Sequence, residues 1–327
     1  MRVLLLGATG TIGQAVCHVL VKRGDQVICP VRQVAGFKGG MREADIRTLL
    51  PGADLRFMST DLPTWFDASS IQQERIDVVI SCLASRSGAP SDAWHVDYGI
   101  HSKLLKQLSQ AGVGHFILLS AICVQKPLLA FQQAKLAFES ELITSGIKYS
   151  IVRPTAFFKS LSGQLRRLRE GKSFLLFGDG ELTACKPISD SDLASFIADC
   201  ITDTDKQSRI LPIGGPGEAI TPLQQGEYLF KQLGLPPRFR HVPVALMDSV
   251  ISLLALGGHL IPALASKAEL AKIGRYYATE SMLVWDEVNG RYDAAATPSY
   301  GSQTLFEYYD QLISGRAQST LGDHAVF

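Results

Sequence analysis

Residues 2–16, "RVLLLGATGTIGQAV", join a short apolar run to a glycine-rich turn and then to the start of a helix pattern. Gly7, Gly10 and Gly13 lie at the junction with the spacing GxxGxxG, which differs from the GxGxxG of the standard dinucleotide fingerprint. Glycines at such a turn let the backbone approach a pyrophosphate, which then faces the free N–H groups of the helix N-terminus. A glycine triplet also occurs in ordinary turns, but its place between a strand and a helix predicts a dinucleotide site.

The same alternation of apolar runs and helix patterns continues along the chain. Continuous apolar runs separated by helices are typical of a parallel sheet that helices cover on both faces. The pattern predicts an α/β fold with a doubly wound, mostly parallel Rossmann sheet of about seven strands within residues 1–216. The expected strands are residues 2–7, 26–32, 54–59, 77–83, 115–120, 149–154 and 209–215.

The alternation ends after about residue 216. Residues 221–234 and 297–315 predict helices, and residues 243–283 predict one long apolar helix followed by an aromatic stretch. We therefore expect residues 217–327 to form a smaller, mainly helical substrate-binding lid over the sheet, with residues 155–185 contributing to the cleft.

The composition excludes several classes of protein. Hydrophobic residues make up 46% of the 327 residues and charged residues 19%, which is enough apolar matter for a large core. The net charge of +1 argues against a nucleic-acid partner. The six cysteines include no CxxC pair, so no iron–sulfur motif is present, and reduced thiols in a cytoplasmic protein are expected. Because a strand pattern begins at residue 2, we expect no signal or transit peptide in this chain.

Arg32 ends the second apolar run, about where an Asp or Glu usually holds the ribose of NAD. A guanidinium at this place pairs with the 2′-phosphate of NADPH and offers little to a free hydroxyl, so we predict NADPH as the cofactor. A solvated surface arginine is the alternative. Asp61 follows the third run and is a candidate acceptor for the adenine amino group, although a turn or helix-capping aspartate explains it nearly as well.

The motifs "GATGTIG", "STDL" and "SCLAS", a strand end "LLS" at Ser120 and a lysine at 135 resemble the short-chain dehydrogenase/reductase superfamily, and within it the atypical NmrA-like and isoflavone-reductase-like branch. "RPTAFFKSLSGQ", "KIGRYYATESMLVWD" and "TPSYGSQTLFEYY" are similar to the family of NADPH-dependent divinyl (proto)chlorophyllide 8-vinyl reductases over nearly the whole chain. The resemblance implies cofactor contacts within these motifs, at Gly7, Thr9, Gly10, Thr11, Ile12, Gly13, Arg32, Asp61, Leu62, Cys82, Leu83, Ala84, Ser120, Lys135 and Pro154.

The resemblance also implies the reaction. Its members reduce the 8-vinyl group of a magnesium tetrapyrrole, divinyl chlorophyllide or divinyl protochlorophyllide, to an ethyl group in chlorophyll or bacteriochlorophyll synthesis. The sequence does not choose between these two pigments, and it does not specify the number of subunits.

Residues 128–143, "LLAFQQAKLAFESELI", retain the lysine of the superfamily's YxxxK helix as Lys135 but carry Phe131 in place of the tyrosine. A phenylalanine has no proton for a carbonyl oxygen. Reduction of a vinyl group conjugated with a large ring forms no alkoxide, so it needs no acid beside an oxygen. We therefore assign Lys135 to positioning the nicotinamide ribose, with a solvated helix lysine as the alternative. Ser120 occupies the place of the superfamily's catalytic serine, and a serine that only satisfies backbone groups is its alternative.

A tetrapyrrole needs a wide apolar and aromatic cleft with a few polar anchors. We predict substrate contacts from Phe157, Phe158, Tyr276 and Tyr277, although such rings are more often core residues. Further candidates are three basic side chains for a propionate, three tyrosines as the proton source, and one histidine for the pigment's magnesium. The basic side chains are Lys159, Arg166 and Arg167, and the tyrosines are Tyr276, Tyr277 and Tyr292. The histidine is His259, although a lone histidine in an apolar helix is more often simply packed.

Residues 242–265 are apolar but interrupted by Asp248, Ser249, Ser252, His259, a glycine pair and two prolines. We therefore expect a buried or interfacial helix that touches a photosynthetic membrane at its surface and does not span it. No metal site of the protein's own is predicted. Three alternatives to the vinyl reductase stay open: a non-enzymatic NmrA-like NADP sensor, a reductase for small phenolic double bonds, and an assembly subunit in which NADPH is structural.

Overall fold

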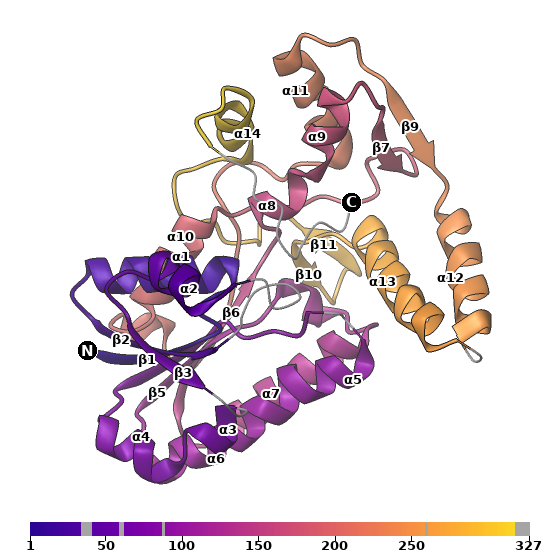
Figure 1. Cartoon of the computed structure of the whole chain (residues 1–327). Helices are drawn as coiled ribbons and strands as arrows, with labels where there is room; N and C mark the ends of the chain where they lie inside the picture. The colour runs from indigo at the N-terminus through magenta and orange to yellow at the C-terminus, as the bar shows by residue number, and fades with distance from the viewer. Residues whose placement is uncertain (34–40, 59–61, 87–88, 259–260, 318–327) are drawn as a thin grey trace.

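Seven parallel strands form the central sheet, in the order β3-β2-β1-β4-β5-β6-β8 (Figure 1). The computed structural model describes residues 1–33, 41–58, 62–86, 89–258 and 261–317. The predicted Rossmann sheet is confirmed, and each strand agrees with its predicted range to within two residues at either end. The strands are β1 (Arg2–Leu6), β2 (Gln26–Arg32), β3 (Asp54–Met58), β4 (Val78–Ser81), β5 (His115–Leu119), β6 (Lys148–Pro154) and β8 (Arg209–Ile213).

Helices cover both faces of the sheet because alternate strand residues point to opposite sides. Val3 and Leu5 lie in one buried core, whereas Leu4 and Leu6 lie in the other. The first face is covered by α1 (Thr11–Lys22), α2 (Glu43–Leu49) and α10 (Asp190–Asp199). The second is covered by α3 (Leu62–Trp65), α4 (Ala68–Glu74), α6 (His101–Ala111) and α7 (Ala130–Thr144).

A third core lies beyond the carboxyl end of the sheet. It joins segments that are far apart in sequence, and strands β7 and β9 pair in parallel within it. Its elements are α8 (Phe158–Leu161), α9 (Gly163–Arg169), β7 (Phe174–Phe177), α11 (Pro222–Leu233), β9 (Phe239–Val242) and α14 (Leu305–Ile313). Helices α11 and α14 lie within the ranges predicted as helical, while the two short strands are not foreseen by the sequence pattern.

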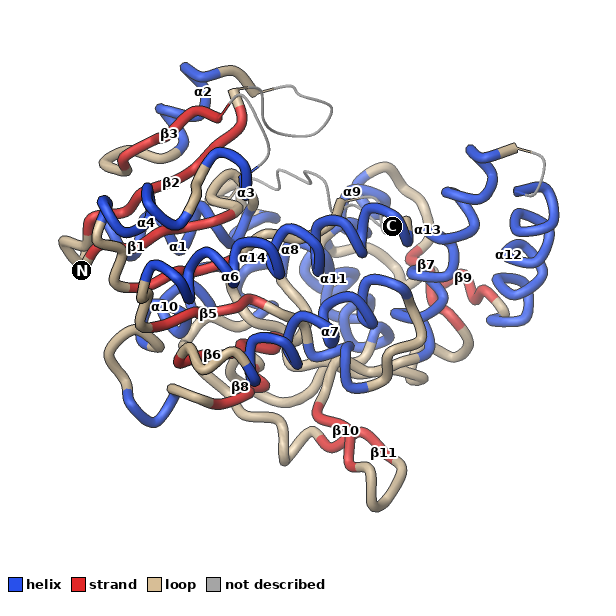
Figure 2. Tube along the Cα trace, turned by 90° about the horizontal axis from the view of Figure 1, so that it is seen from below, coloured by secondary structure: helices blue, strands red, loops and turns tan. Residues whose placement is uncertain are grey.

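The predicted single helix over residues 243–283 is wrong, because the chain turns back on itself there. Figure 2 shows α12 (Val244–Gly258) and α13 (Pro262–Thr279) side by side, projecting from the sheet. Two glycines end the first helix, and Pro262 opens the second, where its missing N–H costs no hydrogen bond. A short antiparallel hairpin, β10 (Val284–Asp286) and β11 (Arg291–Asp293), then follows.

Single-turn segments complete the described elements. The helix that ends in α6 begins as α5 (Pro90–Ala93) and passes through a π-helical turn, η2 (Trp94–Ile100). Two 3₁₀ turns, η3 (Ile122–Gln125) and η4 (Thr204–Lys206), follow β5 and α10. In a parallel sheet the carboxyl ends of all strands meet at one edge, so the loops after β1, β4, β5 and β6 converge there.

Candidate active site

The glycine loop after β1 is built so closely that two of its glycines admit no side chain. Gly7 has φ +73°, and a Cβ added to it would lie 2.7 Å from the carbonyl oxygen of Cys82. A Cβ on Gly13 would lie 2.2 Å from the carbonyl oxygen of Gly7. Gly10 differs, because the same construction meets only the Gly7 carbonyl oxygen, at 3.3 Å. The loop therefore packs tightly on the protein side and is open at Gly10.

The open side of the loop fits a pyrophosphate. Gly10 is the N-cap of α1, and no side chain caps that helix. The Ile12 side chain is buried in the core, so only the backbone N–H of this residue can bind a ligand. The backbone N–H of Thr11 lies next to it in the first turn of α1. The Thr9 carbonyl accepts from Gln14 Nε2 at 2.8 Å, which holds the turn. An anion at a helix N-terminus is stabilised by these N–H groups and by the helix dipole.

Arg32 is exposed at the end of β2, at the same edge of the sheet. Although the side chain is exposed as a whole, neighbouring atoms partly desolvate its guanidinium, and this desolvation and then the positive charge of Arg86 lower its pKa. Two arginines whose charges repel one another gain from an anion placed between them. Asp61 lies outside the described residues. Leu62 begins α3 with its side chain buried in the second core.

Lys135 forms a buried ion pair that the sequence did not predict. Its ammonium Nζ donates to Asp97 Oδ1 at 2.9 Å, and the exposed fractions of the two side chains are 11% and 0%. Asp97 lies in the π-helical turn η2 and also accepts from Ser85 Oγ at 2.6 Å. A π turn adds a residue to a helix and redirects its side chains, and such turns are frequent at functional sites. The helix position expected for Lys135 is confirmed, and Asp97 orients its side chain.

Ser120 is also held by a buried carboxylate. Its hydroxyl donates to Glu139, one turn beyond Lys135 on α7, and Arg153 of β6 pairs with the same carboxylate. Phe131, one turn before Lys135, packs in an apolar cluster with Cys123 and Tyr276. Helix α7 thus presents a phenylalanine, a lysine and a glutamate in successive turns at the carboxyl edge of the sheet. Because Glu139 holds Ser120, the serine hydroxyl has a structural task that explains its burial.

A buried histidine supports the end of β4, where Cys82, Leu83 and Ala84 leave the sheet. His101 Nδ1 lies 2.9 Å from the carbonyl oxygen of Val96 and therefore donates to it. Nε2 then accepts from Ser81 Oγ at 2.7 Å, and the Leu83 N–H donates to the same hydroxyl. Burial, and then the charge of Lys135, lower the pKa of His101 to about 4. The imidazole is neutral and fixes the strand end.

His101 makes the stability of the protein pH-dependent. The unfolded histidine titrates near pH 6.5 and the folded one near 4, so the unfolded state binds more protons between these values. We expect the free energy of unfolding to fall as the pH drops from about 6.5 to about 4, with His101 contributing up to about 3 kcal/mol. Buried His115, whose pKa is also lowered to about 4 by burial, acts in the same direction.

Urea unfolding across this pH range measures the effect. His101→Gln removes one titrating group and should make the decline shallower, whereas His95→Gln, at an exposed position, should leave the slope unchanged. Identical slopes for His101→Gln and the parent protein would contradict the assignment.

The segment after β6 carries several of the residues predicted to contact the substrate, and their burial and contacts make some of these roles less suitable. Pro154 is buried at the end of β6, and its contact with the cofactor stays a prediction. Phe158 is only 3% exposed and belongs to the third core, so its ring cannot face a flat substrate. Phe157 is partly buried and packs against the first core. Lys159 Nζ lies 3.1 Å from Thr11 Oγ1, at the glycine loop, which suits a cofactor phosphate better than a propionate.

The other two basic candidates do not point to a pigment either. The Arg166 side chain is 73% exposed and pairs only loosely with Glu170 on its own helix, at 3.9 Å. The Nε atom of Arg167 is buried. Neither residue is brought toward Lys135 by a contact in the described part of the chain. His259, proposed for magnesium, lies outside the described residues.

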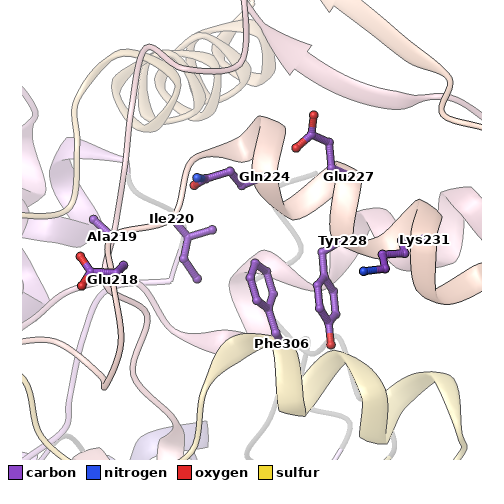
Figure 3. A pocket seen from close by; sticks show the side chains of 8 residues that line it. All are labelled: Glu218, Ala219, Ile220, Gln224, Glu227, Tyr228, Lys231 and Phe306. Atoms are coloured by element: carbon purple, nitrogen blue, oxygen red, sulfur yellow. The ribbon is translucent and has the colours of Figure 1, made fainter.

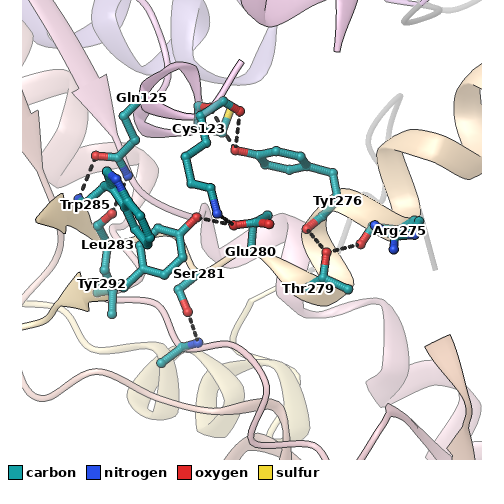
Figure 4. Close-up of polar contacts among 12 residues, drawn as sticks. Cys123, Gln125, Arg275, Tyr276, Thr279, Glu280, Ser281, Leu283, Trp285 and Tyr292 are labelled. Carbon is teal, nitrogen blue, oxygen red and sulfur yellow. Dashed lines mark hydrogen bonds and ion pairs between the residues drawn. The ribbon is translucent and has the colours of Figure 1, made fainter. Parts of the chain in front are cut away.

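Two of the three candidate tyrosines are held by strong hydrogen bonds (Figure 4). Tyr276 is 4% exposed, and its hydroxyl donates to the carbonyl oxygens of Cys123 at 2.9 Å and Lys126 at 3.1 Å. Tyr292 donates to Glu280, which also pairs with Lys126. The Tyr276 hydroxyl thus anchors α13 to η3, and its contact with substrate stays a prediction that this burial disfavours. Tyr277 is 37% exposed, and its hydroxyl lies 3.9 Å from Cys123 Sγ.

Helix α13 thus lies over the apolar cluster that contains Phe131. Ile273, one turn before Tyr277, packs into that cluster, and Leu270, a further turn back, is 51% exposed. Exposed Leu128 just before α7 adds apolar surface on the other side. Ile273 and Tyr276 of α13 therefore share an apolar cluster with Phe131 of α7.

A separate surface pocket of about 360 Å³ lies between α11 and the start of α14 (Figure 3). Tyr228 and Phe306 stack there with ring centres 4.1 Å apart. None of the predicted cofactor or substrate residues lines it. We therefore place the active site at the carboxyl edge of the sheet and not in this pocket.

Comparisons with known proteins agree with this geometry. The model of an NAD(P)H-binding family matches residues 7–204. The divinyl chlorophyllide a 8-vinyl-reductase, chloroplastic, of Cucumis sativus is 49% identical over 333 residues, covering 100% of this chain and 80% of the relative. The protein of the same name from Arabidopsis thaliana is 47% identical and covers 99% and 79%.

Among solved structures, the binary complex of leucoanthocyanidin reductase with NADPH from Vitis vinifera superposes with a TM-score of 0.68 at 16% identity, covering 96% of this chain and 100% of that one. That likeness shows the shared fold. The chain belongs to the NAD(P)H-binding family and to the family of divinyl chlorophyllide a 8-vinyl-reductases.

Proposed function

We propose that this chain reduces the 8-vinyl group of divinyl chlorophyllide a, or of divinyl protochlorophyllide a, to an ethyl group with NADPH. The observation that carries the proposal is the identity of 46–49% to divinyl chlorophyllide a 8-vinyl-reductases over 99–100% of this chain. Membership of the NAD(P)H-binding family supports an oxidoreductase with a Rossmann fold.

The residues of α7 suit the reduction of carbon and not of a carbonyl group. Phe131 offers no proton at the position where the superfamily has its tyrosine, and it is packed in the apolar cluster. The Lys135 ammonium, oriented by Asp97, remains to hold the nicotinamide ribose. NADPH, when bound, supplies a hydride. The protein must then fix the ribose, exclude water and keep the vinyl group in reach.

The cofactor site favours a 2′-phosphate. Arg32 and Arg86 act on each other electrostatically at the end of β2, and Lys159 reaches Thr11 beside the open glycine loop. These cations suit NADPH better than NADH, whose ribose carries a hydroxyl at the same place.

Replacing Arg32 with alanine should separate the two cofactors. We expect the Kd for NADPH to rise by about 10- to 100-fold, because a charge-assisted hydrogen bond contributes roughly 1.5–3 kcal/mol. The Kd for NADH should change little. Isothermal titration calorimetry measures both, and Arg166→Ala, an exposed arginine on α9, is the matched control. Equal loss of affinity for NADPH and NADH would show that Arg32 does not read the 2′-phosphate.

The apolar side of α13 supports a flat, lipophilic substrate. The spacing of Leu270, Ile273 and Tyr277 puts them on one side of that helix; Ile273 packs in the cluster with Phe131, Tyr277 lies beside Cys123, and Leu270 is exposed. A tetrapyrrole plate lying between α13 and α7 would cover these side chains and bring one edge to Lys135.

Helix α12 supports contact with a membrane surface. Leu246, Val250, Leu253 and Leu256 are 45–71% exposed and lie on one face, away from α13. Exposed Arg240 precedes the helix, which suits an anionic lipid surface. No helix in the described residues is long and apolar enough to cross a membrane. Co-sedimentation with anionic vesicles tests the contact; Leu253→Asp should weaken it without changing turnover of a dispersed pigment.

One assay separates the proposal from its alternatives. Purified protein is mixed with NADPH and divinyl chlorophyllide a, and the blue shift of the Soret band is followed as the 8-vinyl group leaves conjugation. We expect full conversion that requires NADPH. Tight NADPH binding without any conversion of either pigment would favour a redox sensor or a structural cofactor, and turnover of small phenolic substrates alone would favour a phenolic reductase.

A further inference from the structure

Vinyl reduction consumes one proton for each hydride, and α7 has no side chain in the usual place to give it. Phe131 stands there, packed against Cys123 and Tyr276. The question is which group near Lys135 holds an exchangeable proton that a substrate can reach. The answer deepens the proposed function and rests on it.

The hydrogen bonds of the three candidate tyrosines distinguish them. The Tyr276 hydroxyl donates to two backbone carbonyls and is buried, so its proton is committed to holding α13 on η3. The Tyr292 hydroxyl donates to the Glu280 carboxylate at 2.5 Å. Both interactions are structural, and each would break if the proton left (Figure 4).

Tyr277 has neither commitment. The Tyr277 hydroxyl lies 3.9 Å from Cys123 Sγ, and sulfur is a weak hydrogen-bond partner. The residue is 37% exposed, while Tyr276 beside it is 4% exposed. The exposed part is therefore the edge of the ring, while the hydroxyl points inward beside Cys123, where burial raises the pKa of Tyr277 well above its usual value and keeps the phenol protonated.

Cys123 connects this phenol with the lysine. Burial raises the pKa of the Cys123 thiol, while Tyr277 and the positive charge of Lys135 act on it in the opposite direction. The thiol lies 3.9 Å from the phenol and packs in the cluster that holds Phe131, one turn before Lys135 on α7. Tyr277 and Lys135 belong to separate elements, 142 positions apart in the chain (277 − 135).

We propose that Tyr277 of helix α13 is the catalytic residue that protonates the substrate. Phe131, which stands at the usual position of the proton donor on α7, has no proton to give. A hydride from the reduced nicotinamide forms a C–H bond at one vinyl carbon, and the π electrons of the vinyl bond move into the conjugated ring. The O–H bond of Tyr277 breaks and its proton forms the second new C–H bond. The nicotinamide is oxidised by two electrons, the vinyl group is reduced to ethyl, and water reprotonates the phenolate.

The test compares Tyr277→Phe with Tyr276→Phe and Tyr292→Phe in the full chain. For Tyr277→Phe we expect kcat to fall by at least about 100-fold, the usual minimum for loss of a general acid. The Kd values for NADPH and for the divinyl pigment, measured by equilibrium binding, should stay within about twofold, because the hydroxyl adds little to binding. The two control variants should lose thermal stability and keep kcat within about threefold.

The pH profile adds a second criterion. The parent kcat should be level around neutral pH, because a phenol stays protonated there. The residual kcat of Tyr277→Phe should fall as the pH rises, because its protons then come from hydronium. An inactive parent protein would overturn the proposed function and this assignment together. An active parent with Tyr277→Phe at full kcat, or with weakened pigment binding alone, would overturn only the assignment to Tyr277.

Discussion

Lys135→Met should lose both stability and activity, and the two losses should have different causes. Asp97 is completely buried and the lysine is its cationic partner, so the variant leaves a carboxylate without its counter-charge. Breaking a buried ion pair by removing one partner costs about 3–5 kcal/mol. The activity should fall because nothing then fixes the nicotinamide ribose, and we expect kcat/KM for NADPH to drop by roughly 100-fold or more.

The double variant Asp97→Asn with Lys135→Met separates these causes. Without the charge on residue 97, the buried site is neutral, so urea unfolding should recover most of the lost free energy. The activity should not recover, since the ammonium is still missing. A double variant as unstable as Lys135→Met would show that the pair is not coupled. Full activity and unchanged NADPH affinity in Lys135→Met would remove the positioning role.

Gly10→Asp should abolish cofactor binding and leave the fold intact. A Cβ at this position meets only the Gly7 carbonyl oxygen at 3.3 Å, and aspartate is a favourable N-cap for the uncapped helix α1. The new carboxylate, however, would lie where the pyrophosphate binds. Two unit charges about 4 Å apart repel by about 4 kcal/mol at an effective dielectric constant near 20, so the Kd for NADPH should rise by roughly two to three orders of magnitude.

Gly13→Ala is the matched comparison for this loop. Its added Cβ would lie 2.2 Å from the Gly7 carbonyl oxygen, so the backbone must move. We expect a lower melting temperature as well as weaker binding, whereas Gly10→Asp should melt at or above the temperature of the parent protein. Thermal unfolding without cofactor and calorimetric titration with NADPH measure the two effects. Unchanged NADPH affinity in Gly10→Asp would move the pyrophosphate away from this loop.

Local sequence patterns were sufficient for the sheet. Each strand is a run of mostly apolar residues, and the glycines of the first turn lie within seven residues of the chain. The residues that form each of these elements are therefore also the residues whose pattern predicts it. The break between α12 and α13 lies at Gly257, Gly258 and Pro262, which the sequence showed as interruptions of an apolar stretch but not as a turn between two antiparallel helices. The strands β7, β9, β10 and β11 have only three or four residues each, too few to show a period.

The residues of the candidate site also fall into two groups, those that the sequence identified and those that only the tertiary structure revealed. Gly10, Arg32 and Lys135 could be chosen from the sequence because each has a characteristic position relative to a strand or helix. The partners that give them a role could not, because an ion pair depends on distance in space and on burial. Asp97 is 38 positions from Lys135, and Lys159 is 148 positions from Thr11.

The tyrosines of "GRYYATESML" show this limit most clearly. The sequence established a parallel Rossmann sheet, a glycine loop for a dinucleotide, and a helix that kept its lysine and lost its tyrosine. It could not rank Tyr276 against Tyr277, which are chemically identical neighbours. The tertiary structure did so, because adjacent residues of a helix point in directions about 100° apart. That rotation turns the Tyr276 hydroxyl toward the carbonyl oxygens of Cys123 and Lys126, and the Tyr277 hydroxyl toward the Cys123 thiol.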